Sequence, residues 1–496
     1  MTVTRPHAVV IGAGFGGLAA AVRLLARGYR VTILERLDAP GGRAYVFRQA
    51  GYSFDAGPTI ITAPHLLAEL WALHGQRMED AVELKRLDPF YELHFDDGTV
   101  FRARADLDAM RAEVARISPH DVAGFERYLA ASAAIYRVAF ERLADRPFGK
   151  ISDMLAALPD LLRLGGYRSV YDMAARYFRD PRLRMAFSYH PLLVGGNPFH
   201  TTAYYGLIAH LERAHGVHYA VGGTGAIVAA LARLIEGAGG RFRFGADVAQ
   251  ILQGGEKATG VALSNGEQIP ADVVVSNADA AWTYGKLLNG AARRGWTGRA
   301  LARRKFSMGL FVWYFGTNRQ FSHLHHHTIL LGPRYRGLLD DIFTRKILAE
   351  DFSLYLHRPT ASDPSVAPPG CDTFYVLSPV PNLASGIDWA DVAEPYRVAI
   401  QRRLETTLLP GLGATLVTSR VMTPLDFQSR LKSVHGAGFS LEPRLLQSAW
   451  FRPHNESPRV KGLFLVGAGT HPGAGVPGVI CSARILDRVL TSSGYP

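Results

Sequence analysis

The stretch that decides the fold is HAVVIGAGFGGLAAAVRLLARG, residues 7–28. Its opening is continuously apolar, which is typical of a parallel strand covered on both faces. Three glycines follow at the spacing G-x-G-x-x-G. Gly12 permits a tight turn, Gly14 lets the backbone approach a pyrophosphate, and Gly17 lets the next helix lie close to the strand. The free N–H groups at the start of that helix favour phosphate, so the stretch predicts a nucleotide site.

An acidic residue extends this site. The segment RVTILE, residues 30–35, reads as the second strand, and its Glu35 comes 18 residues after Gly17. A carboxylate at this place hydrogen-bonds the ribose hydroxyls of an adenosine and disfavours the 2′-phosphate of NADP. Strand, turn, helix and acid together predict a ligand that contains adenosine diphosphate, and they leave FAD and NAD open.

Two further glycine turns favour FAD. Gly41 and Gly42 precede Arg43, whose guanidinium is placed to reach a pyrophosphate, and DAGPT at residues 55–59 forms another turn soon after. An NAD-binding unit would continue here through a helix to a third strand. Repeated glycine turns instead suit a long cofactor that lies extended against the backbone.

Length and composition restrict the classes of protein. A chain of 496 residues, 48% hydrophobic and 20% charged, predicts two or three globular domains. Its two cysteines, Cys371 and Cys481, exclude a disulfide scaffold and fit a reducing compartment. We recognise no signal peptide and no apolar run of about 18 residues. The net charge of +12 comes mostly from scattered arginines without a nucleic-acid-binding module, so we expect contact with anionic membrane lipid and no nucleic acid.

The order of segments predicts a discontinuous nucleotide domain. Residues 105–215 carry apolar residues at helical spacing, and 221–252 return to a glycine turn, a helix and a strand. Strands are expected at 308–316 and 373–380, and a strand, a glycine turn and a helix at 462–490. We therefore expect an FAD-binding domain from 1–90, 220–300 and 445–496, a largely helical region at 91–219, and a second inserted region at 301–444.

Several segments resemble a known family. The N-terminal motifs resemble the flavin-dependent amine oxidase superfamily. FSYHPLLVGGNPF (187–199), GLFVWYFG (309–316), QSAWFRPHN (447–455) and LFLVGAGTHPGAGVPGV (463–479) resemble bacterial phytoene desaturases of carotenoid biosynthesis, over essentially the whole chain. The resemblance implies an α/β fold: a discontinuous Rossmann-type FAD domain with an inserted mixed α+β substrate domain that contains a helical, membrane-associating part. It makes 91–219 the substrate and membrane-contact region and 301–444 the substrate-binding domain.

The resemblance also implies a site and an activity. Non-covalent FAD would desaturate the C40 polyene phytoene in several steps to neurosporene or lycopene, on a protein attached peripherally to the cytoplasmic side of the cell membrane. The implied cofactor-binding residues are Gly12, Ala13, Gly14, Gly16, Gly17, Glu35, Arg36, Gly41, Gly42, Arg43, Gly57, Pro58, Thr59, Val248, Gly467, Gly469, Thr470, Val476 and Pro477.

The C-terminal motif departs from the wider superfamily. Many relatives place an acid after this strand to hold the ribityl chain, whereas this chain continues with Gly467, Ala468, Gly469 and Thr470. Backbone N–H groups or the Thr470 hydroxyl would then hold the ribityl chain. By position, GAGVPG at 473–478 lies beside the isoalloxazine, where glycine and proline leave room for a flat substrate.

The implied chemistry needs no catalytic triad. An allylic C–H is too weak an acid for a histidine or glutamate to deprotonate, so hydride loss to the flavin precedes proton loss. The protein mainly aligns the chain and excludes water. The proton acceptor, the number of double bonds, the oligomeric state and the choice between oxygen and a quinone as electron acceptor stay open. The alternatives are a sister carotenoid desaturase or isomerase, a flavin amine oxidase and a lipid-binding flavoprotein.

Three local features have competing interpretations. MLAALPDLLRLGGYRSVY (154–171) presents Leu158, Leu161 and Leu162 near basic residues, which suits either a membrane-surface helix or an ordinary core helix. HLHHH (323–327) lacks flanking acidic or cysteine ligands, so we predict a loop or strand edge and no metal site. Cys481 lies in a helical pattern and is expected to be a buried, apolar residue rather than a flavin attachment point.

Overall fold

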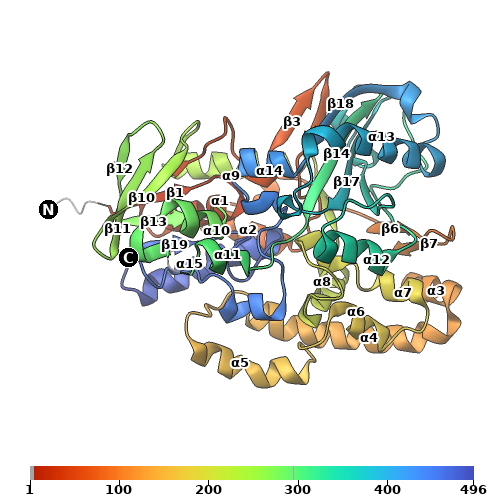
Figure 1. Ribbon diagram of the computed structural model, residues 1–496, viewed down its shortest axis with the longest axis horizontal. Coiled ribbons are helices and arrows are strands. Elements are labelled where there is room, and N and C mark those ends of the chain that lie inside the picture. The colour runs from red at the N-terminus through yellow and green to blue at the C-terminus, as the bar shows by residue number, and fades with distance from the viewer. Residues whose placement is uncertain (1–4, 294, 496) are drawn as a thin grey trace.

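The computed structural model describes residues 5–293 and 295–495, and the two largest of its sheets are joined by a helical part (Figure 1). The nucleotide sheet has five parallel strands in the order β19-β13-β1-β2-β9. Their bounds are β19 (Leu463–Leu465), β13 (Val273–Ser276), β1 (His7–Ile11), β2 (Arg30–Leu34) and β9 (Arg241–Arg243). The sheet therefore combines both ends of the chain with a middle piece, as the sequence predicts.

Strand β1 shows why this sheet is buried on both sides. Ala8 and Val10 pack into a core with the flanking helices α1 (Phe15–Ala26), α2 (Pro64–Ala72), α9 (Thr224–Gly237) and α15 (Val476–Ser492). Val9 and Ile11 point to the opposite face because side chains alternate along a strand. There they meet the antiparallel sheet of β10 (Val248–Gly254), β11 (Lys257–Leu263) and β12 (Gln268–Pro270).

The second sheet is mixed and has seven strands. Its order is β18 (Leu416–Met422), β14 (Gly309–Thr317), β17 (Asp372–Val380), β16 (Leu354–His357), β15 (His327–Leu330), β6 (Tyr91–His94) and β7 (Val100–Ala103). Only the β15–β6 pair is parallel among these described strands. The hairpin of β6 and β7 thus joins residues near 100 to the sheet formed by the later insert.

Strand β14 connects this sheet to two separate cores. All nine of its residues are buried. Leu310, Val312 and Tyr314 face the helical part, whereas Phe311, Trp313 and Phe315 face a core beneath α13 (Trp389–Thr407). Because both faces are covered, the strand carries no polar alternation, and its apolar run predicts a strand correctly.

The helical part lies along one side of the molecule (Figure 1). It consists of α3 (Leu107–Ile117), α4 (Val122–Tyr136), α5 (Ile151–Arg163), α6 (Val170–Ala175), α7 (Pro181–Ala186) and α8 (Leu207–His215). The remaining described α-helices are α10 (Ala280–Trp282), α11 (Gly298–Ala302), α12 (Tyr335–Asp340) and α14 (Pro424–Leu431). Two further sheets have two strands each: β3 (Val46–Gln49) with β4 (Tyr52–Asp55), and β5 (Leu84–Arg86) with β8 (His218–Ala220). None of the described helices combines the length and apolar content that crossing a bilayer requires.

Candidate cofactor and substrate site

A cavity of about 550 Å³ runs between the nucleotide sheet, the seven-stranded sheet and the helical part. One half is lined by the glycine turns and by the start of α15. The other half is lined by aliphatic and aromatic side chains of β14, α8 and the segment before it, among them Leu192, Leu310, Val312, Leu207 and Leu211. A polar cofactor region and an apolar region therefore share one continuous space.

The first glycine turn is packed so tightly that side chains are excluded. The Gly12 N–H donates to the Leu34 carbonyl at 2.8 Å, and Gly12 has a φ of +91°. A Cβ on Gly17 would lie 2.0 Å from the Gly12 carbonyl oxygen, and one on Gly16 would lie 3.0 Å from the Cα of Gly467. Gly12, Gly14 and Gly16 line the cavity at the N-terminus of α1, where backbone N–H groups favour phosphate.

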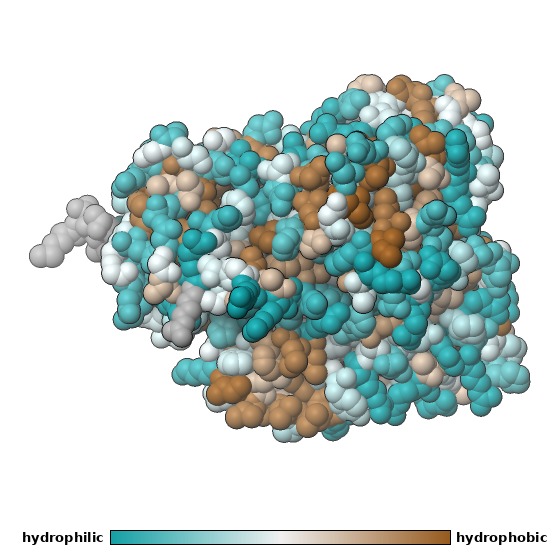
Figure 2. All heavy atoms as spheres, viewed as in Figure 1, coloured by the Kyte–Doolittle hydropathy of each residue, from teal (hydrophilic) through white to brown (hydrophobic). Residues whose placement is uncertain are grey.

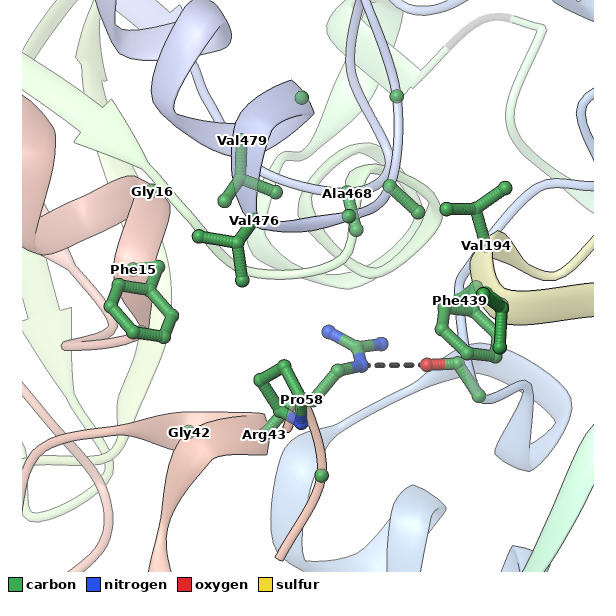
Figure 3. Close-up of a pocket in the computed structure, with 18 of the residues that line it drawn as sticks. Phe15, Gly16, Gly42, Arg43, Pro58, Val194, Phe439, Ala468, Val476 and Val479 are labelled. Carbon is green, nitrogen blue, oxygen red and sulfur yellow. Dashed lines mark hydrogen bonds between the residues drawn. The ribbon is translucent and has the colours of Figure 1, made fainter. Parts of the chain in front are cut away.

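The second and third glycine turns close the other side of the same region. The Gly41 N–H donates to the Ala13 carbonyl at 2.9 Å, which places this turn beside the first. A Cβ on Gly57 would lie 2.4 Å from the Arg43 carbonyl oxygen. The Arg43 guanidinium points into the cavity in Figure 3, and its Nε donates to the Gly438 carbonyl at 2.7 Å. Its charge is thus held where an anionic group would lie.

Glu35 and Arg36 define one end of the cofactor region. The two Glu35 oxygens accept backbone hydrogen bonds from Ala13 and Leu37 at 2.8 and 2.9 Å. Glu35 is 5% exposed and lines the cavity, as do Arg36 and Val248. Carboxylate oxygens have further lone pairs, so Glu35 remains able to accept ribose hydroxyls.

Asn277 and Asp279 are candidate site residues that the sequence analysis missed. Asn277 follows β13, and its Nδ2 donates to the Gly12 carbonyl at 3.3 Å. Asp279 lines the cavity, and one of its oxygens, Oδ2, has no hydrogen-bond partner among the described residues. Burial raises the pKa of Asp279, and Arg43 opposes that rise. Their position after the carboxyl end of a parallel strand is the signal that would have identified them.

The C-terminal motif contributes the wall opposite Arg43. Figure 3 shows Ala468, Val476 and Val479 on this wall, with Phe439 and Val194 to one side. Gly473 and Gly475 have φ values of 140° and 95°, so the chain bends there before α15 begins at Val476. The N-terminus of α15 thus opens on the cavity, where the sequence analysis expects the isoalloxazine.

The structure brings most of the predicted residues to the cavity. Those that line it are Gly12, Gly14, Gly16, Glu35, Arg36, Gly41, Gly42, Arg43, Gly57, Pro58, Thr59, Val248, Val476 and Pro477. Ala13, Gly17, Gly467, Gly469 and Thr470 lie behind this surface. Thr470 is 1% exposed, and its carbonyl accepts from Arg452 at 3.2 Å. The Thr470 hydroxyl stays a predicted ribityl contact, and the buried Asp279 carboxylate, which lines the cavity, is a second candidate for it.

The residues present fit FAD in order along the cavity. Glu35 and Val248 suit the adenosine, the glycine turns and Arg43 suit the pyrophosphate, and the 473–478 loop suits the ring. Cys481 is buried in α15, and burial raises the pKa of its thiol to about 12, which agrees with its expected role as a packing residue. These residues therefore match a long cofactor that is held without a covalent bond.

Comparisons with known proteins agree with this arrangement. The flavin containing amine oxidoreductase family matches residues 15–485. The chain is 52% identical to the neurosporene-forming phytoene desaturase of Cereibacter sphaeroides, over 97% of this chain and 94% of that protein. It is 48% identical to the lycopene-forming phytoene desaturase of a Paracoccus species, over 98% of this chain and 97% of that protein.

A solved structure shares the fold at much lower sequence identity. Wild-type putrescine oxidase bound to putrescine superposes with a TM-score of 0.64 at 14% identity, covering 98% of this chain and 99% of that one. The parallel nucleotide sheet and the mixed seven-stranded sheet are therefore those of a flavin amine oxidase fold, and the cofactor is FAD. The chain belongs to the flavin containing amine oxidoreductase family and, within it, to the bacterial phytoene desaturases.

Proposed function

We propose that this protein is an FAD-dependent oxidoreductase that desaturates phytoene in successive steps to neurosporene or lycopene. The observation that carries the proposal is the cavity, whose cofactor region continues without interruption into an apolar region. A C40 polyene has no polar group to bind, so alignment must come from such a wall. The identity of about half of all residues with desaturases along almost the whole chain supports the same substrate.

The cavity walls suit removal of hydrogen from a CH₂–CH₂ unit beside a double bond. Bound FAD supplies a hydride acceptor. The chain's own contribution is to hold the polyene against that acceptor and to keep water from the allylic cation that forms on the substrate. Tyr189, Tyr375 and the aliphatic residues beside them line the apolar region. Such a wall lets the polyene slide, which allows desaturation at several positions.

A membrane-facing entrance supplies the substrate in this proposal. Helix α5 exposes Ile151, Leu155, Leu158 and Leu162 by 52, 61, 38 and 54%, and Figure 2 shows an apolar surface over it. Leu161, which the sequence placed with these leucines, is instead buried against Phe148 and Trp450. The four exposed side chains form a surface patch, whereas Leu161 packs α5 onto the rest of the protein.

The apolar patch lies next to the cavity. Met154 and Leu161 of α5 line the cavity, and so do Leu445 and Ala449 of the adjoining segment. Leu446 in that segment is 70% exposed. A lipid-soluble substrate can therefore pass from a bilayer surface into the cavity along apolar side chains. We place the protein peripherally at the cytoplasmic face of the cell membrane, where anionic lipid attracts its net charge of +12.

Purified holoprotein supplied with phytoene in liposomes tests the proposal. The expected result is anaerobic bleaching of the flavin by phytoene and a red-shifted product, which chromatography identifies as neurosporene or lycopene. Bleaching by a primary amine and not by phytoene would favour an amine oxidase and refute the proposal. Adding oxygen or a quinone to the reduced protein shows which acceptor restores the flavin colour.

A further inference from the structure

The proposed reaction releases a proton in the apolar region of the cavity. Hydride loss leaves an allylic cation, and the neighbouring carbon must then lose a proton to form the double bond. Water is excluded, so a protein group has to accept that proton. The inference that follows concerns this group and the route by which the proton leaves, and it rests on the proposed function.

Two hydroxyl groups meet at the cavity wall. Thr59 and Tyr355 both line the cavity, and their hydroxyl oxygens are 2.7 Å apart. Thr59 follows Pro58, which Figure 3 shows at the cofactor end beside Arg43. The Tyr355 hydroxyl is also 2.7 Å from Nδ1 of His327. Tyr355 therefore connects the cofactor end of the cavity to a histidine behind the wall.

Three buried histidines lie behind Tyr355. His326, His327 and His357 are 5, 0 and 1% exposed, and one ring nitrogen of each lies within 4.8 Å of those of the other two. Nε2 of His357 and Nε2 of His326 are 3.0 Å apart. Nε2 of His327 has no hydrogen-bond partner among the described residues. The sequence segment HLHHH supplies two of these rings, and the third comes from the adjacent strand β16.

The chain of groups continues to the outside of the sheet. Nδ1 of His326 is 2.8 Å from the hydroxyl oxygen of Ser362, which is partly exposed. The Ser362 carbonyl accepts a hydrogen bond from the exposed Lys85 amine. A ring nitrogen of His327 lies within 4.8 Å of one on each of the other two histidines. Transfer from His327 therefore requires one bridging water, since two hydrogen bonds span about 5.6 Å.

The resting protonation states suit proton uptake. Burial raises the pKa of Tyr355 well above its usual value and lowers the pKa of His327 and His357 well below theirs. Tyrosine is thus protonated and the imidazoles are neutral. The charged and titratable groups around them are Arg358, which is paired with Asp372 at 2.8 Å, and Asp363, Asp55, Tyr91, Tyr219 and Tyr375.

We propose that Tyr355 accepts the proton lost from the polyene and that His327, His357 and His326 pass it to Ser362. The C–H bond breaks, and its electron pair becomes the new double bond. The proton goes to the Tyr355 oxygen as the phenol's own proton goes to Nδ1 of His327. Because the cation is very acidic, a weak base suffices to take its proton. Onward transfer through the neutral imidazoles then keeps the proton from returning to the polyene.

Glu212 is the competing acceptor in the same cavity. Its carboxylate lines the cavity but already accepts from the Tyr91 hydroxyl at 2.7 Å and lies 3.2 Å from Nε2 of His190. No hydrogen bond in the described part of the chain leads from this group to the surface. A proton on Glu212 would remain buried, whereas one on Tyr355 has a way out.

Single-turnover experiments on FAD-loaded variants test the relay. We expect Tyr355→Phe and His327→Gln to slow product formation about 100-fold and to abolish the solvent isotope effect, because the relay protons exchange with solvent. Tyr375→Phe removes another hydroxyl from the cavity wall and should retain that isotope effect. A wild-type rate and isotope effect in Tyr355→Phe would overturn the proposal. So would a loss of rate and of isotope effect in Glu212→Gln that Tyr355→Phe does not show.

Two measurements do not depend on turnover. In ¹⁵N-histidine spectra of the FAD-loaded protein, His327 should show Nδ1 as an acceptor, and Tyr355→Phe should remove that signature while FAD content stays unchanged. Elemental analysis should find no stoichiometric metal, since a metal ion on the three rings would block the relay and refute it. Failure of the wild-type protein to desaturate phytoene would instead refute the proposed function.

Discussion

The exposed leucines of α5 allow a quantitative test of membrane attachment. Leu155 and Leu162 are 61 and 54% exposed. Full burial of a leucine contributes about 1.5–3 kcal/mol, so the exposed half of each contributes about 1–1.5 kcal/mol when it enters a bilayer surface. Replacing both with serine should therefore cost about 2–3 kcal/mol, which weakens binding about 30- to 150-fold.

Flotation with liposomes measures this loss directly. The variant Leu155→Ser/Leu162→Ser is compared with Val417→Ser/Leu425→Ser, which removes side chains that are 51 and 43% exposed on β18 and α14. Figure 1 shows these elements on the side of the molecule opposite α5. Circular dichroism verifies that each variant is folded. Equal binding by the two double variants, or wild-type binding by the α5 variant, would refute the assignment of α5 as the attachment surface.

Three other outcomes follow from single positions. Gly14→Ala should lower FAD content at least 10-fold and keep the fold, because its Cβ would lie 3.1 Å from Nδ2 of Asn277 and so displace the turn that faces the pyrophosphate; Gly237→Ala, which meets nothing within 4 Å, is the control and should retain FAD. Asp372→Ala should lower the unfolding free energy by about 3–5 kcal/mol in urea titrations, since it leaves the buried Arg358 unpaired, and a loss below about 1 kcal/mol would contradict this. Burial raises the pKa of Asp55 to about 6, so the folded state binds this proton more tightly than the unfolded state; stability should fall as pH rises from about 4 to 6, and an unchanged slope in Asp55→Asn would contradict the cause.

The sequence predicts those parts of the site that local backbone geometry determines. The first glycine turn, Glu35 and the 473–478 loop each lie in one short segment, and the strand and helix beside them follow from apolar periodicity. Glycine at such positions is required by close approach, as the 2.0 Å distance at Gly17 shows. A reader of the sequence can therefore recognise them without knowing the rest of the fold.

Residues whose role depends on distant neighbours escaped prediction. Asn277 contacts the first glycine turn only because β13 pairs with β1, 265 residues earlier. The HLHHH segment gave no sign of its partner, since His327 pairs with His357 across two antiparallel strands. Leu161 is buried in a cluster that includes Phe148 and the distant Trp450, neither of which belongs to its helix. In each case strand order or tertiary packing, and not local pattern, determines the environment.

The position of β19 has a consequence for synthesis on the ribosome. This strand is the edge of the nucleotide sheet and comes from residues 463–465, and α15 follows it. Until those residues have been made, one edge of β13 (VVVS), which is buried in the folded protein, has no pairing partner. The apolar face of α1 likewise lacks α15, which covers it in the folded protein. Exposed strand edges favour aggregation. The sheet therefore stays open at β13 until β19 and α15 have been made, and a chain stopped before residue 463 exposes an edge that favours aggregation.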